Sequence, residues 1–254
     1  MIAYDNTTEL DIDIPLMDGH KVHAKLRGRL DDKNPIVIMM HGRPGTGNEL
    51  LQYLGARYLS QQGITTLRLW MYDYGQSYRS IINCSLDTHI SDFETAVDYV
   101  SSKSQGKVFA LGHSYGGLTI LGSKARLDGA VLWDPTHGMA WHDSNFDSLD
   151  YPEKTYDNLV VGLGGSGYLY PVRQGEQDKL LGDNTSWAAN KGYPTKYILA
   201  AAGPLARYAK KYFEVADDPK ELVEITGAHH QFEDSDAITE QLFAETAEFI
   251  KKYN

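Results

Sequence analysis

Apolar and polar side chains alternate along residues 8–29, at the start of the chain. The apolar positions form two sets, Leu10, Ile12 and Ile14, then Val22, Ala24 and Leu26. Asp18-Gly19, a pair typical of turns, lies between the two sets. Alternation with a period of two is typical of a strand with one buried face. The pattern therefore predicts an antiparallel hairpin at the N-terminus.

After this hairpin, continuous apolar runs alternate with segments whose apolar residues recur at helical spacing. Strands are expected at 35–40, 64–70, 108–111, 130–133, 197–201 and 222–225. Helices are expected at 47–62, 92–100, 117–124, 205–216 and 237–252. Continuous apolar runs suit strands buried on both faces, as in a parallel sheet. The alternation predicts an α/β fold with a mostly parallel central sheet flanked by helices.

The alternation stops between residues 135 and 193. This stretch is rich in Gly, Asp, Asn and Tyr, and we interpret it as a lid inserted into a single domain that spans residues 1–254. Its aromatic residues are Trp141, Phe146, Tyr151, Tyr156, Tyr168, Tyr170 and Trp187. They could line an acyl or phenolic pocket, or form the small core of the lid itself. The sequence leaves both interpretations open.

Composition and charge exclude several classes of protein. Hydrophobic residues make up 42% of the 254 residues and charged residues 23%, as in ordinary globular proteins. No segment approaches the roughly 18 apolar residues of a membrane span, so we expect no membrane partner. The net charge of −10 disfavours nucleic acid. Residues 1–10 lack the basic region and apolar run of a secretory signal, and we expect a cytoplasmic protein.

Cysteine and histidine usage gives no indication of a metal or cofactor. Cys84 is the only cysteine, which rules out an intrachain disulfide and any cysteine-based zinc site. The nine histidines show no metal-ligand spacing. Residues 162–167 match the G-x-G-x-x-G dinucleotide pattern, but Pro171 follows where the phosphate-binding helix should continue. We therefore interpret residues 162–167 as a lid loop.

The most specific motif is Gly112-His113-Ser114-Tyr115-Gly116, a G-x-S-x-G sequence. An expected strand precedes it, and a segment compatible with a helix follows it. A serine in a sharp strand-to-helix turn exposes its hydroxyl above the sheet, and the flanking glycines allow the close backbone approach that this turn needs. The motif predicts that Ser114 is a nucleophile.

A serine nucleophile needs a general base and a group that orients this base. The sequence Gly227-Ala-His-His-Gln-Phe232, after the last expected strand, offers two candidate bases, His229 and His230. Asp134 directly follows the strand at 130–133 and is a candidate acid, although Asp134-Pro135 is also a common turn opener. Asp217, Asp218 and Glu233 are the other candidate acids.

An oxyanion hole requires two backbone N–H groups beside the nucleophile. Tyr115, the residue after Ser114, supplies one in the predicted geometry. The loop His41-Gly42-Arg43-Pro44-Gly45 supplies the other, and we assign it to Arg43 because Pro44 has no N–H. We expect the Arg43 side chain to pair with an acidic neighbour.

Together, Ser114, the two-histidine loop, the His41-Gly42 loop and the Asp134 turn resemble the α/β-hydrolase superfamily over nearly the whole chain. The resemblance favours His230 as the base, because the stretch is similar to a Gly-Ala-x-His-x-Phe pattern of these hydrolases. In most members the acid follows the penultimate strand, but the segment 200–207 contains no carboxylate. The other documented position is the end of the preceding strand, where Asp134 lies.

The resemblance implies a cofactor-independent serine hydrolase that cleaves small or medium carboxylic esters. The chain is similar to small esterases of the cinnamoyl-esterase and monoglyceride-lipase type. A thioesterase, acyltransferase or peptidase would use the same machinery. A non-catalytic ligand-binding protein with this fold is the alternative from another class. The sequence leaves the substrate and the oligomeric state open.

Overall fold

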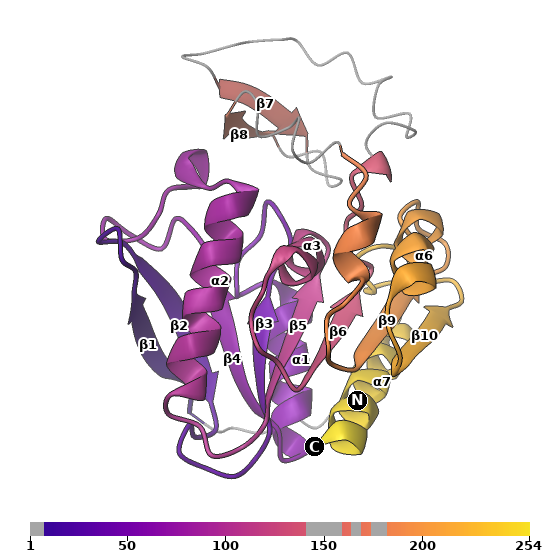
Figure 1. Ribbon diagram of the computed structural model, residues 1–254, viewed down its shortest axis with the longest axis horizontal. Coiled ribbons are helices and arrows are strands. Elements are labelled where there is room, and N and C mark those ends of the chain that lie inside the picture. Colours follow the sequence, from indigo (N-terminus) through magenta and orange to yellow (C-terminus); the bar gives the residue numbers. More distant parts are fainter. Residues whose placement is uncertain (1–7, 141–158, 164–168, 174–181) are drawn as a thin grey trace.

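The computed structural model describes residues 8–140, 159–163, 169–173 and 182–254. Eight strands form one open sheet in the order β1-β2-β4-β3-β5-β6-β9-β10 (Figure 1). Their bounds are β1 Leu10–Pro15, β2 Lys21–Arg27, β3 Ile36–Met40, β4 Thr65–Trp70, β5 Val108–His113, β6 Gly129–Trp133, β9 Thr195–Ala200 and β10 Lys220–Ile225. The β1–β2 and β2–β4 pairs are antiparallel, and the other neighbours are parallel. The predicted α/β fold with its N-terminal hairpin is confirmed.

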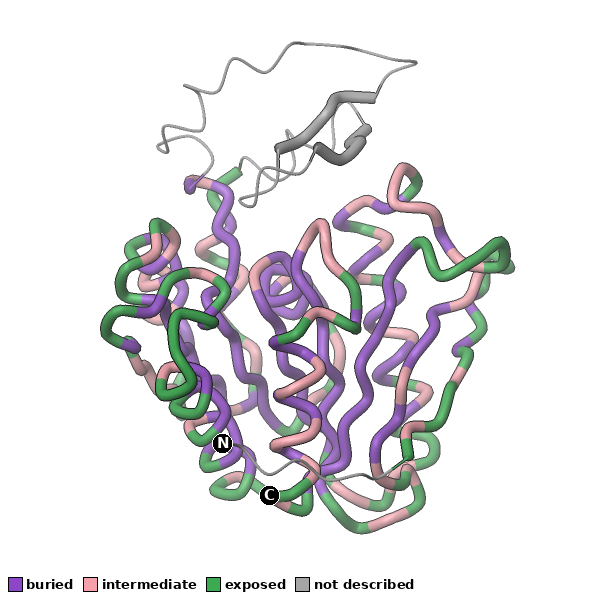
Figure 2. Tube along the Cα trace, turned by 180° about the vertical axis from the view of Figure 1, so that it is seen from behind, coloured by how far each residue is buried: buried purple, intermediate pink, exposed green. Residues whose placement is uncertain are grey.

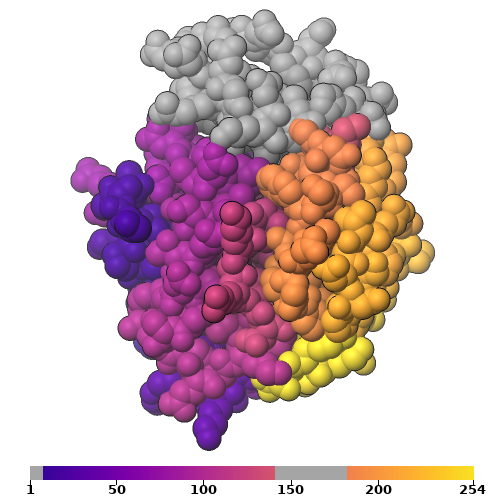
Figure 3. Space-filling model, viewed as in Figure 1, coloured from indigo at the N-terminus to yellow at the C-terminus, as the bar shows by residue number. Residues whose placement is uncertain are grey.

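Helices cover both faces of this sheet. On one face lie α2 Leu86–Ser101, α3 Tyr115–Gly122 and α6 Ala206–Val215, and on the other lie α1 Leu50–Gln61 and α7 Asp236–Tyr253 (Figure 1). In the space-filling view, atoms of α2 and of the segment that contains α6 cover the first face (Figure 3). Two short 3₁₀ helices, Ile81–Asn83 and Thr185–Ala188, lie in the loops.

The central strands separate two hydrophobic cores, as their apolar runs predict. Along β3, Ile36 and Ile38 belong to the core beneath α2, α3 and α6, whereas Val37 and Met39 belong to the core beneath α1 and α7. All of these side chains are buried, and the strands form the buried centre of the molecule in Figure 2. Truncation of a core side chain such as Ile38 to Ala costs about 2–5 kcal/mol of stability.

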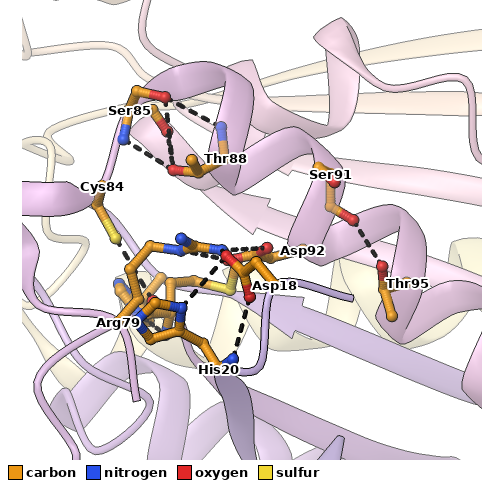
Figure 4. Close-up of polar contacts among 11 residues, drawn as sticks. Asp18, His20, Arg79, Cys84, Ser85, Thr88, Ser91, Asp92 and Thr95 are labelled. Carbon is orange, nitrogen blue, oxygen red and sulfur yellow. Dashed lines mark hydrogen bonds and ion pairs between the residues drawn. The ribbon is translucent and has the colours of Figure 1, made fainter. Parts of the chain in front are cut away.

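Helix α2 begins six residues earlier than the apolar spacing indicates. The Ser85 side chain accepts from the Thr88 N–H, and the Thr88 hydroxyl accepts from the Ser85 N–H, so the two residues form a capping box. One turn further along, Asp92 accepts two hydrogen bonds of 2.9 Å from Arg79, which also pairs with Asp18 (Figure 4). These contacts attach the loop after β4 to α2 and to the N-terminal hairpin.

The structure describes the expected lid, residues 135–193, only in part. Strands β7 Leu159–Leu163 and β8 Leu169–Arg173 form an antiparallel pair, which differs from the βαβ unit that a dinucleotide site requires. Residues 141–158, 164–168 and 174–181 lie outside the described residues, and with them most of the aromatic residues named above. Trp187 lies within 2.9 Å of the position that a methyl group on Gly122 would take, so it packs against the end of α3. The lid remains a prediction.

Candidate active site

Ser114 lies in the sharp turn between β5 and α3, as the G-x-S-x-G motif predicts. Its backbone has φ 54° and ψ −120°, outside the regions that residues other than glycine normally occupy. Such a conformation costs about 1–3 kcal/mol and persists only where the surrounding structure imposes it. Here the Ser114 N–H donates to the Trp133 carbonyl at 3.0 Å, and the Ser114 carbonyl accepts from the Gly117 N–H at 3.0 Å.

The glycines around Ser114 are required by close contacts. A methyl group added to Gly112 would lie 2.6 Å from the Gly116 carbonyl oxygen, and one added to Gly116 would lie 2.5 Å from the Met40 carbonyl oxygen. A methyl group on Gly42 would lie 3.2 Å from Ser114 Cβ and 3.6 Å from Ser114 Oγ. The loop after β3 therefore lies directly against the Ser114 side chain.

Asp134 and His230 are in contact although 96 residues separate them. The His230 Nδ1–H donates to Asp134 Oδ2 at 2.6 Å. This bond leaves the lone pair on Nε2, the tautomer that a general base needs. Asp134 is fully buried, and its second oxygen accepts from the Ala200 N–H at 3.3 Å. Its own N–H donates to the Ile198 carbonyl at 2.8 Å.

Ser114, Asp134, His230 and the Gly42 loop lie at one edge of the sheet. They follow the carboxyl ends of β5, β6, β10 and β3, respectively, which point upward in Figure 1. This edge is where parallel α/β sheets bind their ligands. Asp217 and Asp218 instead precede β10, at the opposite edge, so they lie far from His230 along the strand. Glu233 is exposed on the loop that carries His230.

His229 points to a different carboxylate. Its Nδ1 bonds Asp234 Oδ1 at 2.6 Å, and its side chain is 67% exposed, against 27% for His230. Asp234 also accepts from the His229 N–H at 2.8 Å, which makes this a local turn contact. The structure thus brings His230, and not His229, to Asp134.

His113 was not selected from the sequence, and it supports the His230 loop. Its Nε2–H donates to the His230 carbonyl at 2.8 Å, and the two ring centroids are 4.7 Å apart. Burial, aided by the neighbouring His230, lowers the pKa of His113 to about 3. His113 is therefore a neutral donor at ordinary pH. In the sequence, the only indication of a role for His113 was its position next to Ser114 in the G-x-S-x-G motif.

His41 fixes the loop on the other side of Ser114. Its Nδ1–H donates to the Gly42 carbonyl at 2.7 Å, and its Nε2 accepts from the Met71 N–H at 3.3 Å. Burial lowers the pKa of His41 to about 4, so the ring stays neutral and keeps both bonds. The fixed loop holds Arg43 next to Gly42, in the chain position predicted for an oxyanion donor.

The two predicted oxyanion residues, Arg43 and Tyr115, also meet through their side chains. The Arg43 guanidinium carbon lies 5.6 Å from the centre of the Tyr115 ring, a cation–π contact. Arg43 Nη2 also donates to the Ile81 carbonyl at 3.3 Å. The expected pairing of Arg43 with an acidic side chain stays a prediction. Tyr115 is the first residue of α3, where backbone N–H groups lack intrahelical acceptors.

Two further residues lie against Ser114 and against the Gly42 loop, respectively. The Thr136 hydroxyl lies 3.2 Å from Ser114 Oγ. The Glu49 carboxyl accepts from the Gly42 N–H, and burial together with the nearby Glu233 raises its pKa to about 7. A methyl group on Gly45 would lie 2.5 Å from Glu49 Oε1, which shows how closely this loop surrounds the carboxyl. Neither residue belongs to a motif, so only the fold could reveal them.

The described residues hold neither a metal site nor a membrane-spanning helix. No group of three or more His, Cys, Asp or Glu side chains in this part of the chain could hold a metal ion. None of the helices that the structure describes is long and apolar enough to cross a membrane.

Comparison with known proteins places the fold among the α/β-hydrolases. No family model and no curated protein matches the chain. Est1E from Butyrivibrio proteoclasticus, solved with ferulic acid, is similar with a TM-score of 0.75 and 18% identity over 95% of this chain and 98% of its own. A putative hydrolase from Agrobacterium vitis has a TM-score of 0.77 and 14% identity over 97% and 100% of the two chains. Mouse alpha/beta hydrolase domain-containing protein 10 has a TM-score of 0.75 and 12% identity over 96% and 100%.

The chain therefore has the α/β-hydrolase fold, and the resemblance stated from the sequence is confirmed at the level of the fold. The solved structures with this fold include esterases and other hydrolases.

Proposed function

We propose that this protein is a serine hydrolase that cleaves small or medium carboxylic esters through an acyl-enzyme intermediate. The observation that carries the proposal is the 2.6 Å bond between His230 Nδ1 and the buried Asp134, at the sheet edge where Ser114 occupies its strained turn. A buried carboxylate that orients a histidine, at the same sheet edge as a serine in such a turn, matches the arrangement used in acyl transfer. The fold shared with esterases such as Est1E supports the same reaction class.

In the proposed reaction, His230 Nε2 takes the proton of Ser114 as Oγ attacks the ester carbonyl carbon. The carbonyl oxygen becomes an oxyanion, which the N–H groups of Arg43 and Tyr115 stabilise; one such donor is typically worth about 10²–10³ in turnover. His230 then returns the proton to the leaving alcohol, and the acyl group stays on Ser114. Water, deprotonated by His230, releases the acid and restores Ser114. These steps use only side chains and backbone of the chain itself.

The test is covalent labelling by a fluorophosphonate, which reacts rapidly only with a base-activated serine. We expect the wild-type protein to be labelled at Ser114, and the Ser114→Ala variant to remain unlabelled. Peptide mapping of the adduct identifies the residue. Chromogenic esters of increasing acyl length, together with a feruloyl ester chosen because Est1E binds ferulic acid, then define the substrate. Folded wild-type protein that resists the reagent would favour the non-catalytic binding protein.

A further inference from the structure

The Thr136 side chain lies within hydrogen-bond distance of the Ser114 hydroxyl. Thr136 Oγ1 lies 3.2 Å from Ser114 Oγ, and Thr136 is 6% exposed. It comes from the loop after β6, two residues beyond Asp134, whereas the predicted oxyanion donor Arg43 comes from the loop after β3. Strands β3 and β6 flank β5 on its two sides. Thr136 therefore contacts Ser114 from the side away from the Gly42 loop.

Two hydrogen bonds hold the Thr136 backbone in this position. Its N–H donates to the Ser114 carbonyl at 3.0 Å, so its backbone is attached to the strained turn itself. Its own carbonyl accepts from the Tyr212 hydroxyl at 3.0 Å. Tyr212 is fully buried on α6, and its ring lies 4.7 Å from that of His137. The Thr136 backbone is thus fixed beside Ser114, and only the side-chain torsion of this buried threonine remains to be restricted during a reaction.

The Thr136 hydroxyl can act as a donor to one lone pair of the Ser114 oxygen. Ser114 Oγ carries one proton and two lone pairs. In the proposed attack the proton moves to His230 Nε2, and one lone pair forms the new bond to the carbonyl carbon. The second lone pair needs a donor as negative charge grows on Oγ. Thr136 Oγ1–H is within hydrogen-bond distance of it.

We propose that Thr136 is a further catalytic residue, whose hydroxyl donates to Ser114 Oγ during acylation and deacylation. In acylation the bond stabilises the charge that develops on Oγ as its proton leaves. In deacylation, Oγ is the leaving atom when the acyl C–O bond breaks, and the same donor stabilises it until His230 returns the proton. Thr136 keeps its own proton throughout. This inference rests on the proposed role of Ser114 as nucleophile.

A structural role for Thr136 makes different demands. The backbone bonds to Ser114 and Tyr212 need only a residue of suitable shape, which valine satisfies because it is nearly isosteric with threonine. The catalytic role needs the hydroxyl, which serine retains. Thr136→Val and Thr136→Ser therefore separate the two roles. Thr119 offers a matched control, because its buried hydroxyl donates to the Tyr115 carbonyl at 3.0 Å and does not contact Ser114.

The experiment compares the rate of fluorophosphonate labelling, kcat and KM for the wild type, Thr136→Val, Thr136→Ser and Thr119→Val, with thermal unfolding of each. Removal of one hydrogen bond to a developing charge should lower the labelling rate and kcat of Thr136→Val about tenfold, with KM changed less than about threefold. Thr136→Ser should stay within about threefold of the wild type, and Thr119→Val within about twofold. If Thr136→Val does not fold, Thr136→Ala compared with Thr136→Ser gives the same contrast.

Two results would overturn the inference alone. The first is that Thr136→Val is labelled at the same rate as a reactive wild-type protein. The second is that Thr136→Ser loses as much activity as Thr136→Val. A wild-type protein that is folded and not labelled at all overturns the proposed function of Ser114, and this inference with it.

Discussion

Two adjacent histidines, His229 and His230, make almost the same contact with carboxylates from two different parts of the molecule. Each bonds a carboxylate oxygen through Nδ1 at 2.6 Å. Asp234, the partner of His229, is five residues away on the same exposed loop. Asp134, the partner of His230, comes from the end of β6 and is fully buried. The two contacts therefore have the same length and the same chemical groups, but the two carboxylates differ in burial and in their position in the fold.

The difference shows what a carboxylate needs in order to orient a base. Asp234 is bound by His229 of its own turn, through both the backbone N–H and the ring, so these contacts stay within the loop. Asp134 is fixed independently of the histidine, by the Ala200 N–H on its side chain and the Ile198 carbonyl on its N–H. Only a carboxylate held by the rigid sheet can hold His230 in a constant orientation relative to Ser114.

The largest expected effect is the contrast between the two histidines. His230→Ala should lower kcat by several orders of magnitude, because only oxyanion and binding contributions then remain. His229→Ala should cost about tenfold or less, since it removes a surface pair. Steady-state kinetics on a chromogenic ester, with circular dichroism as a check on folding, measures both. Should the His229 variant be the inactive one, the comparison would be reversed.

The two carboxylates provide the next contrast. Asp134→Asn should lower kcat by a factor of about 10⁴, because an amide favours the wrong imidazole tautomer, while KM changes little. Asp234→Asn is the matched control and should keep activity within a few-fold. A pH–rate profile of each variant separates a changed base from a changed fold. Equal loss in both variants would mean that the buried position of Asp134 confers no special role.

A rescue experiment tests whether position alone matters. Strand β9 ends beside β6, and a methyl group on Gly203, just beyond β9, would lie 3.5 Å from the backbone nitrogen of His230. A side chain at this position would start beside the main chain of His230, and we expect an aspartate carboxylate there to reach the imidazole ring. Gly203→Asp in the Asp134→Asn background should therefore regain about tenfold or more in kcat, and Gly203→Asn should not. If Gly203→Asp restores no activity, a carboxylate after β9 cannot replace Asp134 after β6.

Much of the fold could be predicted from local sequence. The apolar runs of β3 to β6 and the helical spacing of α1, α6 and α7 gave elements within a few residues of those found. The boundary of α2 was missed because its start depends on the Ser85–Thr88 capping box and not on apolar spacing. The position of the Ser114 turn followed from glycines, one of which meets a local requirement, namely the close approach of Gly112 to the Gly116 carbonyl.

The site was only partly predictable, because most of its contacts join distant segments. Asp134 was placed by its position after a strand, and its contact with His230 agrees with this choice. Thr136, His113 and Glu49 carry no motif of their own. Each acquires its place through a partner elsewhere: Thr136 through Ser114, His113 through the His230 carbonyl, and Glu49 through the Gly42 N–H. Such pairs become visible only when the strand order is known.

Glu49 extends the comparison to a carboxyl that has no histidine. It lies on the Gly42 side of Ser114, and its charged neighbour is Glu233, from the same loop as His229 and His230. The Gly42 N–H favours its ionised form, but burial and the repulsion from Glu233 outweigh this bond. The result is a pKa of about 7, raised from about 4.5. Asp134 and Asp234 each have a histidine ring nitrogen at 2.6 Å, whereas the charged neighbour of Glu49 is another carboxylate, Glu233.

The smallest expected effect follows from this raised pKa and appears in stability. Folded Glu49 holds its proton more tightly than the unfolded chain does, so the free energy of unfolding should fall as pH rises from about 4.5 to about 7, and level off above. Glu49→Gln keeps an oxygen for the Gly42 N–H and removes the titration. The variant should therefore gain stability relative to the wild type across this range, by about 1–3 kcal/mol, measured by urea unfolding at several pH values. Glu233→Gln, which removes the repelling charge, should shift the range to lower pH. A stability difference that does not vary with pH would show that Glu49 titrates normally, and that a carboxyl beside this site needs no basic partner to remain ionised.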